Sequence, residues 1–412
     1  MPASTEEESM TSKCPFGGDA TAPVFDADYF ADPYTRYEQL REAGPVHQVW
    51  LPEGMPAWLV TRYDLVGELL KDKRLVRNRE HANESYQNEL LPQAVREGNL
   101  HMEDGALHTR LRRFMNFAFT PKRIDALRPR MSKVADELLE AFATAGGGDL
   151  MTAFAEPMPI AIIVDILGIP ADMHGDFHTW SDMIMCGVLE DAHQAGRNLI
   201  EYTHQLIERK RAEPLDDLLS HWVHGKDEEG NGLNDNEIVG MTFFLLLGGY
   251  VTTFGSFGTA VLGLLAQPEK AAQLRANPDL LPEAVEEFLR WDGSAQNSMR
   301  RFAIEEMEIA GVRIPKGDTV ILSLGSANRD PRHFPDPDVL DFEREDKQHW
   351  TFGRGPHHCP AKELARIELQ IMIGKLLERF PDLSLAVPAE SIEWRPNYIF
   401  RAPRTLPVSL RP

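Results

Sequence analysis

The sequence predicts a mainly α-helical protein with a minor β component, organised as one large domain. From about residue 107 to residue 264, apolar side chains recur at three- and four-residue spacing, which is the pattern of packed helices. Within this region, the segment from Asn234 to Leu265 is apolar on almost every face. Such a helix is expected to run through the middle of a protein. No internal repeat and no linker rich in Pro, Gly or Ser divides the chain.

The long apolar helix is expected to begin at Asn234, because Asn-Asp-Asn-Glu is a plausible helix-capping sequence. The other expected elements, in chain order, are a helix, two strands, a helix, two strands, a last long helix and a hairpin: Pro33–Ala43, Val46–Trp50, Trp58–Thr61, Leu281–Trp291, Arg300–Ile304, Thr319–Leu324, Pro360 to about Phe380, and the residues after Trp394. Residues 1–20 are expected to form a disordered tail, and residues 21–412 the single domain.

Composition limits the possible partners and the location of the protein. The formal net charge of -21 disfavours a general binder of nucleic acid or of anionic membranes. We find no apolar run expected to span a bilayer, and the polar, acidic N-terminus is unlike a signal peptide. The three cysteines, Cys14, Cys186 and Cys359, are widely scattered, which argues against a disulfide framework. We therefore expect a cytoplasmic protein.

One segment carries a specific chemical signal, the run F-G-R-G-P-H-H-C-P from Phe352 to Pro360. Glycines four and six positions before Cys359 allow a tight loop whose backbone can approach a flat ligand. Pro360 suits the first position of a helix. At a helix start, free N–H groups and the helix dipole would lower the pKa of the thiol and stabilise a thiolate.

Two alternatives compete with a thiolate ligand. A lone cysteine is most often a buried structural residue. A zinc site built from His357, His358 and Cys359 is the other alternative. Zinc sites normally draw their ligands from separated pairs, and the sequence has no C-x-x-C pair to complete one.

The run resembles the F-G-x-G-x-H-x-C heme-binding loop of bacterial cytochromes P-450. The resemblance extends to His108-Thr109-Arg110-Leu111-Arg112-Arg113, similar to the family's H-T-R-L-R-R helix, and to Ala327–Pro331 with Phe334–Pro337, similar to the segment before the heme loop. It implies the cytochrome P-450 fold, a long central helix over heme b, and Cys359 as the axial ligand of the iron.

The same resemblance assigns roles to residues around the heme. Those implied to bind the cofactor are His108, Arg112, Arg301 and His357 at its propionates, and Phe352 and Cys359 in the loop. Glu287 and Arg290 fall where the family's E-x-x-R motif stands, with Arg344 as the expected third member of a structural cluster. The spacing alone is uninformative, since Glu38/Arg41, Glu208/Arg211 and Glu363/Arg366 share it.

The middle of the long helix, at Gly248, Gly249 and Thr252, resembles the family's oxygen-activating segment. Paired glycines weaken a helix, so we expect a local opening there, with the Thr252 hydroxyl bonding to dioxygen and relaying protons. The alternative is a glycine pair used for packing and a threonine bonded to its own helix. Val251 departs from the family, which usually has an acid before the threonine. Ala361 departs as well, at a position where glycine is common.

The expected substrate contacts are Phe244, Leu247, Val251, Gln296, Asn297, Tyr398 and Ile399. By analogy with the fold, segments near Arg79–Leu100 and Met183–Leu189 are added to these.

The resemblance implies a monomeric monooxygenase that hydroxylates or epoxidises a small organic molecule, such as a secondary metabolite. It also implies electrons from a ferredoxin and its reductase. The basic run from Arg110 through Arg130, with Arg354 and Lys362, is the expected docking surface. A peroxide-driven peroxygenase, an oxidative coupling enzyme and a non-catalytic heme-thiolate sensor stay open as alternatives.

Overall fold

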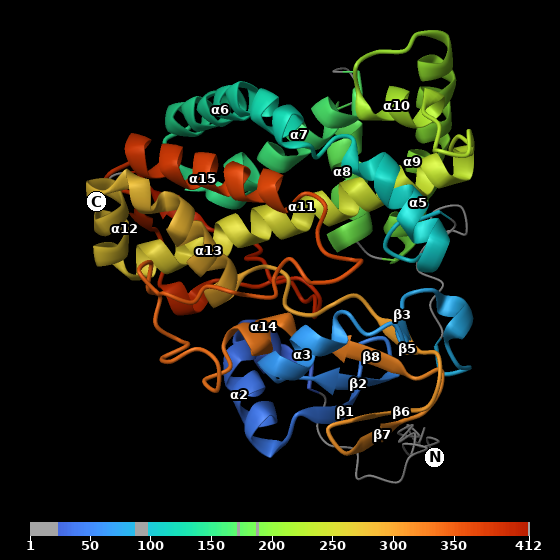
Figure 1. Cartoon of the computed structure of the whole chain (residues 1–412). Helices are drawn as coiled ribbons and strands as arrows, with labels where there is room; N and C mark the ends of the chain where they lie inside the picture. The colour runs from blue at the N-terminus through green and yellow to red at the C-terminus, as the bar shows by residue number, and fades with distance from the viewer. Residues whose placement is uncertain (1–23, 87–97, 171–173, 187–188, 411–412) are drawn as a thin grey trace, which may run out of the picture.

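The computed structural model describes residues 24–86, 98–170, 174–186 and 189–410. It consists of a larger helical part and a smaller part built around a sheet, and Figure 1 shows the two stacked on each other. The predicted disordered tail, residues 1–20, lies outside the described residues. The mainly helical fold with a minor β component is confirmed.

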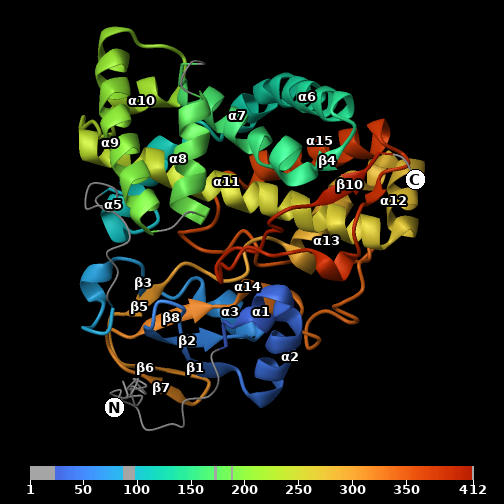
Figure 2. The ribbon, with the colours of Figure 1, turned by 180° about the vertical axis from the view of Figure 1, so that it is seen from behind.

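The larger part is an assembly of helices around α11 (Asp235–Ala266), which crosses the middle of the molecule in Figures 1 and 2. Helices α7, α13 and α15 all contact it. The helices of this part are α5 (Gly105–Asn116), α6 (Pro121–Thr144), α7 (Pro157–Leu167), α8 (His174–Cys186), α9 (Leu189–Ala212), α10 (Leu218–His224), α11, α12 (Pro268–Ala276), α13 (Leu281–Asp292) and α15 (Lys362–Arg379).

The predicted start of α11 is confirmed, since a capping box closes it. The Asn234 side chain accepts from the Glu237 N–H at 3.0 Å, and the Glu237 carboxylate accepts from the Asn234 N–H at 2.9 Å. By length and composition α11 could cross a membrane, contrary to the expectation that no run would do so. However, 78% of its most apolar window is buried inside the fold, as in the core helix of a globular protein.

The smaller part contains a five-stranded sheet of order β1-β2-β8-β5-β3. Strands β2 and β8 pair in parallel and the other neighbours pair antiparallel. The strands are β1 (Val46–Trp50), β2 (Pro56–Val60), β3 (Leu75–Val76), β5 (Arg301–Ala303) and β8 (Thr319–Leu322). The short helices of this part are α1 (Ala27–Ala31), α2 (Pro33–Ala43), α3 (Tyr63–Leu69) and α14 (Leu324–Asn328).

Two small β units complete the described structure. One is the three-stranded sheet of β4 (Gly148–Asp149), β10 (Pro407–Ser409) and β9 (Ser384–Leu385), and the other is the hairpin of β6 (Met307–Ile309) and β7 (Val312–Ile314). The hairpin expected after Trp394 is present as a short antiparallel pairing, in which the Arg395 N–H donates to the Ala402 carbonyl at 3.0 Å.

The start of the last long helix differs from the prediction. Helix α15 begins at Lys362, whereas Pro360 was expected to be its first residue. Pro360 instead lies in the turn that leads from the cysteine loop into the helix. The backbone at Ala361, with φ -98° and ψ 16°, is not yet helical.

Candidate active site

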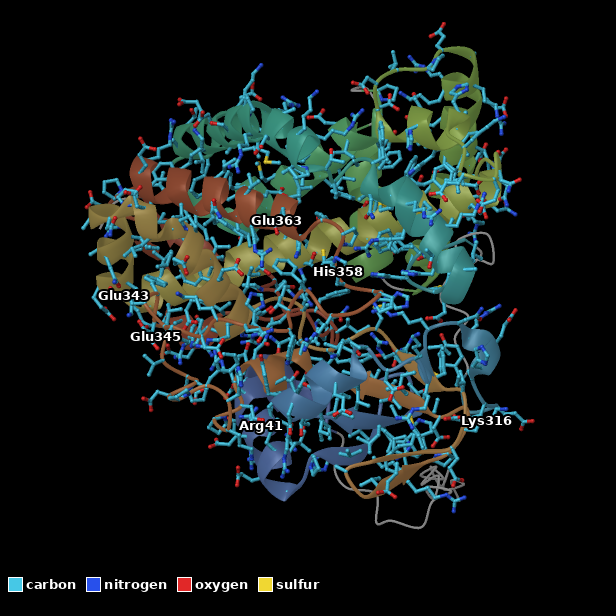
Figure 3. All side chains as sticks on the ribbon, viewed as in Figure 1. Arg41, Lys316, Glu343, Glu345, His358 and Glu363 are labelled. Carbon is cyan, nitrogen blue, oxygen red and sulfur yellow. The ribbon has the colours of Figure 1, made fainter. Side chains whose placement is uncertain are left out.

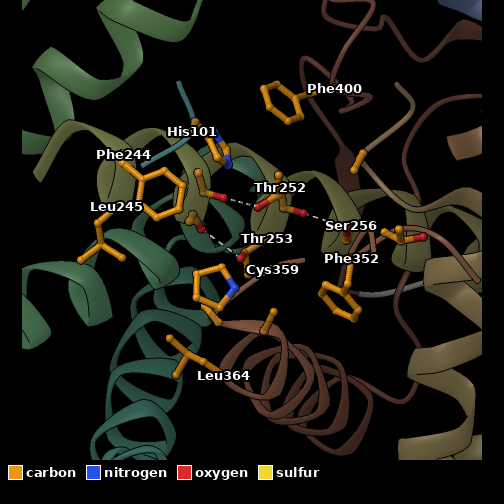
Figure 4. Close-up of a pocket in the computed structure, with 18 of the residues that line it drawn as sticks. His101, Phe244, Leu245, Thr252, Thr253, Ser256, Phe352, Cys359, Leu364 and Phe400 are labelled. Atoms are coloured by element: carbon orange, nitrogen blue, oxygen red, sulfur yellow. Dashed lines mark hydrogen bonds between the residues drawn. The ribbon is translucent and has the colours of Figure 1, made fainter. Parts of the chain in front are cut away.

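A large cavity lies between α11 and α15, and Cys359 and Thr252 both line it (Figure 4). Its empty volume is about 1370 Å³, including the part that opens to solvent. Residues of both helices and of the cysteine loop line it, so a ligand in this space would contact Cys359 and Thr252 together.

The cysteine loop has the tight geometry that its glycines predict. Gly353 and Gly355 have φ angles of 67° and 77°, in the left-handed region that favours glycine. The Cys359 N–H donates to the Phe352 carbonyl at 2.8 Å, which closes the loop. Phe352, Cys359 and Ala361 all line the cavity. The loop thus brings its backbone and the thiol to the cavity wall.

The electrostatics of Cys359 differ from the prediction. Burial raises the pKa of the thiol, although the Ala361 N–H and the charges of Arg112 and Arg366 act in the opposite direction. The prediction of a lowered pKa was wrong because the sulfur is enclosed and lies before α15 begins. A metal ion would reverse this balance, since a coordinated thiol loses its proton.

The zinc alternative is not supported by the arrangement of the two histidines. His357 Nε2 lies 3.0 Å from Asp104 Oδ1, while exposed His358 bonds to the Gly355 carbonyl through Nδ1. Neither contact directs an imidazole to the sulfur of Cys359. Among the described residues, no group of three His, Cys, Asp or Glu side chains could hold a metal ion.

Buried donors without partners gather beside the cavity. Arg77 lines it, and neither its Nε nor its Nη1 has a partner among the described residues. Arg301 Nε and Nη2 and His108 Nε2 also lack partners among the described residues, although these two residues do not line the cavity as described. Burial and mutual repulsion lower the pKa of Arg77 to about 9, and burial lowers that of Arg301 to about 10. Buried cations of this kind call for anionic partners.

One carboxylate, Asp104, ties this cluster to the cysteine loop. It accepts from the backbone N–H groups of Arg77 at 2.6 Å and Asn78 at 2.8 Å, besides its contact with His357. Burial and Arg77 lower the pKa of His357 to about 3, and burial and Arg112 lower that of His108 to about 4. Both imidazoles are therefore neutral hydrogen-bond donors at pH 7.

Arg112, expected at the same anionic group, is directed elsewhere. It does not line the cavity as described. Its Nη1 donates to the His358 carbonyl at 2.7 Å and its Nε to Asn116 Oδ1 at 3.1 Å. Arg112 therefore holds the cysteine loop against α5. Its positive charge also lowers the pKa of the Cys359 thiol.

These observations fit heme b. A flat group with two carboxylates would occupy the wide cavity, place its iron at Cys359 and satisfy the orphaned donors of Arg77, His108 and Arg301. His357 lies at the same edge, where the single N–H of its neutral ring is donated to Asp104.

The glycine pair of α11 does not open the helix, as had been expected. The helix is continuous across Gly248 and Gly249. A Cβ on Gly249 would lie 3.0 Å from Ile163 Cδ1, so this glycine allows α7 to pack closely. A Cβ on Gly248 would meet only Phe244, at 3.8 Å, and Gly248 lines the cavity. Gly249 therefore allows close helix packing, and Gly248 leaves space in the cavity.

The hydroxyls beside these glycines bond to their own helix. Thr252 Oγ1 donates to the Gly248 carbonyl at 2.7 Å, and Ser256 Oγ donates to the Thr252 carbonyl at 2.7 Å (Figure 4). Back-bonding leaves the lone pairs of the Thr252 oxygen free to accept a further hydrogen bond. Thr252 lines the cavity.

A buried acid that sequence reasoning missed also lines the cavity, Glu368 on α15. Burial alone raises its pKa to about 8, and its Oε1 has no partner among the described residues. The carboxyl is therefore protonated at pH 7. Val251 is 4% exposed and does not line the cavity as described.

The structure separates the expected substrate contacts into two groups. Phe244, Asn297 and Ile399 line the cavity. The others do not line it as described: Leu247, Val251, Gln296 and Tyr398. Gln296 instead donates through Nε2 to the Tyr34 hydroxyl and the Gly293 carbonyl, which is a structural role. Parts of the two expected substrate segments, residues 87–97 and 187–188, lie outside the described residues.

The E-x-x-R pair and its third member meet in the core. Glu287 and Arg290 form two contacts of 2.7 Å with both side chains 0% exposed, and Arg344 Nε lies 3.2 Å from Glu287. Arg290 also donates to the Asn328 and Pro337 carbonyls. The cluster thus joins α13 to the irregular segment that precedes the cysteine loop.

Sequence reasoning missed four polar residues of the site: Arg77, His101, Asp104 and Glu368. Arg77, His101 and Asp104 lie outside helical patterns, so periodicity gives no signal for them. Glu368 had a usable signal, because an acid on a helix face otherwise occupied by Leu364 and Ala365 interrupts an apolar stripe.

Comparisons with known proteins agree with this geometry. The family model described as "Cytochrome P450" matches residues 24–185 and 160–392. The chain is 37% identical over 409 residues to cytochrome P450 monooxygenase PikC of Streptomyces venezuelae, covering 96% of each. It is 38% identical over 378 residues to mycinamicin IV hydroxylase/epoxidase of Micromonospora griseorubida, covering 90% of this chain and 94% of that protein.

Among solved structures, the polyketide synthase cytochrome P450 PksS of Bacillus subtilis superimposes with a TM-score of 0.89 at 34% identity, over 95% of this chain and 100% of that one. Matches of this extent in sequence and in structure establish more than a shared fold. The chain belongs to the cytochrome P450 family, and it is a heme b monooxygenase.

Proposed function

We propose that this cytochrome P450 uses dioxygen and electrons from an external ferredoxin and its reductase to hydroxylate or epoxidise a small, largely apolar organic molecule. The observation that carries the proposal is a wide cavity with a cysteine thiol on one wall and a threonine hydroxyl on the other. Apolar side chains, among them Ile162, Ile166 and Phe244, make up much of the wall near Thr252.

Relatives support a secondary metabolite as the substrate. Similar proteins include the mycinamicin IV hydroxylase/epoxidase and, at 37% identity, the 6-deoxyerythronolide B hydroxylase of Saccharopolyspora erythraea. We infer a macrolide, another polyketide or a peptide as the substrate class, and we also infer a monomeric, cytoplasmic enzyme.

The chain's own residues would hold the heme and keep it oriented. Cys359 would bind the iron, while Arg77, Arg301 and His108 would bind the two propionates. His357, expected at the same groups, would instead hold Asp104 beside them through its one N–H. When bound, heme supplies the activation of dioxygen at its iron, and a thiolate ligand favours cleavage of the O–O bond. Arg112 would act indirectly by fixing the loop that carries Cys359.

Proton supply would rest on hydroxyl and carboxyl groups, since Val251 has no proton to give. Thr252 Oγ1 would accept a hydrogen bond from water. To pass a proton into the cavity, its O–H would leave the Gly248 carbonyl and turn to the cavity, and the water would replace the proton that is given up. Glu368 would hold a proton at its carboxyl at neutral pH. Both side chains line the cavity, Thr252 from α11 and Glu368 from α15.

The expected docking surface for ferredoxin needs revision. Arg110 is tied to Asp227 at 2.9 Å and to Glu237 at 2.7 Å, and Arg123, Arg128 and Arg130 also pair with acids. Arg113 and Arg354 are exposed. Arg113 lies 3.4 Å from the more exposed Glu228 and follows Arg112, which bonds to the cysteine loop, and Arg354 lies within that loop. We propose that these two, with Lys362, receive an acidic ferredoxin.

Thr252→Ala tests the proposed proton route in the heme-loaded enzyme with ferredoxin, its reductase and NADPH. We expect product formed per NADPH to fall by on the order of tenfold, with a matching rise in hydrogen peroxide, because one proton carrier is lost. Thr242→Ala is the matched control, since Thr242 makes the same back-bond at 2.9 Å on the same helix but does not line the cavity as described.

Unchanged coupling in Thr252→Ala would contradict the proposed role. Efficient turnover with hydrogen peroxide alone, without ferredoxin, would instead support the peroxygenase alternative.

A further inference from the structure

Arg77 and Glu368, whose unpartnered atoms are assigned above to the heme and to proton supply, are joined at the cavity by a third polar side chain that makes no hydrogen bond to another described residue, His101. The hydroxyls of Thr252, Thr253 and Ser256 donate to carbonyls of α11, and those of Ser298 and Thr351 donate to the Met299 and Leu289 carbonyls. The Asn297 amide donates to the Tyr29 and Tyr37 hydroxyls and to the Tyr398 carbonyl. For the His101 ring, no hydrogen bond to another described residue is present.

The position of His101 is fixed by its surroundings. Its backbone N–H donates to Asn99 Oδ1 at 3.0 Å. Its ring stands edge-on to Phe244, with ring centroids 4.4 Å apart and an interplanar angle of 75°. Figure 4 shows the two rings beside each other, on the same wall as Thr252 and across from Cys359. The imidazole is therefore held beside α11, on the side where a substrate would lie.

The ring is neutral at physiological pH. Burial, and the charges of Arg77 and His357, hold the pKa of His101 well below its usual range. A neutral imidazole has one N–H donor and one acceptor nitrogen. Arg77 nearby disfavours a cationic ligand group at this position.

We infer that His101 is a specificity-determining residue, which hydrogen-bonds a neutral oxygen group, a hydroxyl or a carbonyl, on an otherwise apolar substrate. This inference rests on the proposed function and narrows its substrate class. The imidazole stands edge-on to Phe244, which precedes Thr252 by about two helical turns on α11, so the anchored group would lie along the helix from Thr252. Such an anchor would orient the apolar body of the substrate along α11.

The test compares three probes of equal size with the heme-loaded protein: cyclododecane, cyclododecanol and cyclododecanone. Binding is followed by the change in the heme absorbance band and by calorimetry, with no electron donor present. We expect the parent protein to bind the alcohol and the ketone about tenfold more tightly than the hydrocarbon, after correction for their partition from water into a hydrocarbon solvent.

In His101→Phe the alcohol and the ketone should bind no more tightly than the hydrocarbon. His101→Gln, which keeps a donor and an acceptor, should retain most of the tenfold preference. His204→Phe on α9, which does not line this cavity as described, is the control for the same chemical change. A full preference in His101→Phe would overturn the inference. A loss of heme affinity with unchanged preference would do the same and would assign His101 to the heme instead.

A second measurement uses the parent protein alone, in case the variant does not fold. The carbonyl stretch of bound, ¹³C-labelled cyclododecanone should be shifted down from its value in hydrocarbon solvent, because a donated hydrogen bond weakens the C=O bond. An unshifted band would refute the anchor. Since neither readout requires ferredoxin, dioxygen or turnover, failure of the inference is distinguishable from failure of the proposed function.

Discussion

Gly248 and Gly255 on α11 lack a side chain for different reasons. A Cβ at Gly248 would enter the cavity and meet nothing closer than Phe244 at 3.8 Å. A Cβ at Gly255 would lie 2.5 Å from Ser294 Oγ and 2.7 Å from the Arg401 carbonyl oxygen. The first glycine keeps space for ligands, and the second lets the C-terminal segment approach the helix.

Alanine at these two sites should therefore change stability in opposite directions. Gly248→Ala should raise the free energy of unfolding by up to about 1 kcal/mol through helix propensity, while weakening substrate binding because its methyl group fills the cavity. Gly255→Ala should lower it by about 1–3 kcal/mol through overpacking. Denaturant unfolding of the two variants and the parent measures both effects, and equal shifts would contradict this account.

At the scale of elements, the sequence predicts regular structure far better than irregular structure. Val46–Trp50 and Pro33–Ala43 agree with the observed bounds, because alternation and helical periodicity are local properties. The start of α15 was misplaced by two residues, since the turn at Pro360 depends on how the loop packs under the cavity. Arg77 and Asp104 meet His357 only through the tertiary fold, so no local pattern reveals them.

The spacing of E-x-x-R is shared by pairs in very different environments. Glu287 and Arg290 are 0% exposed, whereas Glu208 and Arg211 are 70% and 44% exposed. Removing one partner of a buried ion pair lowers the free energy of unfolding strongly, because the remaining charge stays desolvated. An exposed pair contributes little, since water and salt screen it.

Glu287→Gln should therefore lower the free energy of unfolding by about 3–5 kcal/mol. Glu208→Gln, the control with the same spacing and the same chemical change, should lower it by no more than about 0.5 kcal/mol. Chemical denaturation of the heme-loaded protein provides the comparison. A similar decrease in the free energy of unfolding in both variants would show that burial does not determine how much an E-x-x-R pair contributes to stability.

At the scale of the whole molecule, acidic residues outnumber basic ones, yet exposed cations remain around the cysteine loop. The net charge is -21. Arg354 and Lys362 flank Cys359 in the sequence, and Arg113 follows Arg112, which bonds to the cysteine loop. Figure 3 shows His358 and Glu363 on the same face, where α15 begins. These cations would offset part of the repulsion between an acidic partner and the net negative charge. We also propose that residues 21–412 form a single domain, because α13 of the helical part contacts α14 of the sheet part.

Reversal of charge on this face should slow electron transfer. Arg113→Glu combined with Arg354→Glu should reduce the rate of heme reduction by an acidic ferredoxin on the order of tenfold at low ionic strength, and less at high salt. Stopped-flow reduction measures the rate. Arg313→Glu on β7, an exposed arginine paired with Glu306, is the control. An equal effect of the control, or no dependence on salt, would exclude this docking surface.

The central claim is that Cys359 binds the heme iron as a thiolate. The most direct test is the absorbance spectrum of the dithionite-reduced protein with carbon monoxide, recorded for the parent and for Cys359→Ser. A thiolate ligand gives a strongly red-shifted Soret band, which we expect in the parent and not in the variant. A band at the position typical of an imidazole ligand, unchanged by the substitution, would contradict it.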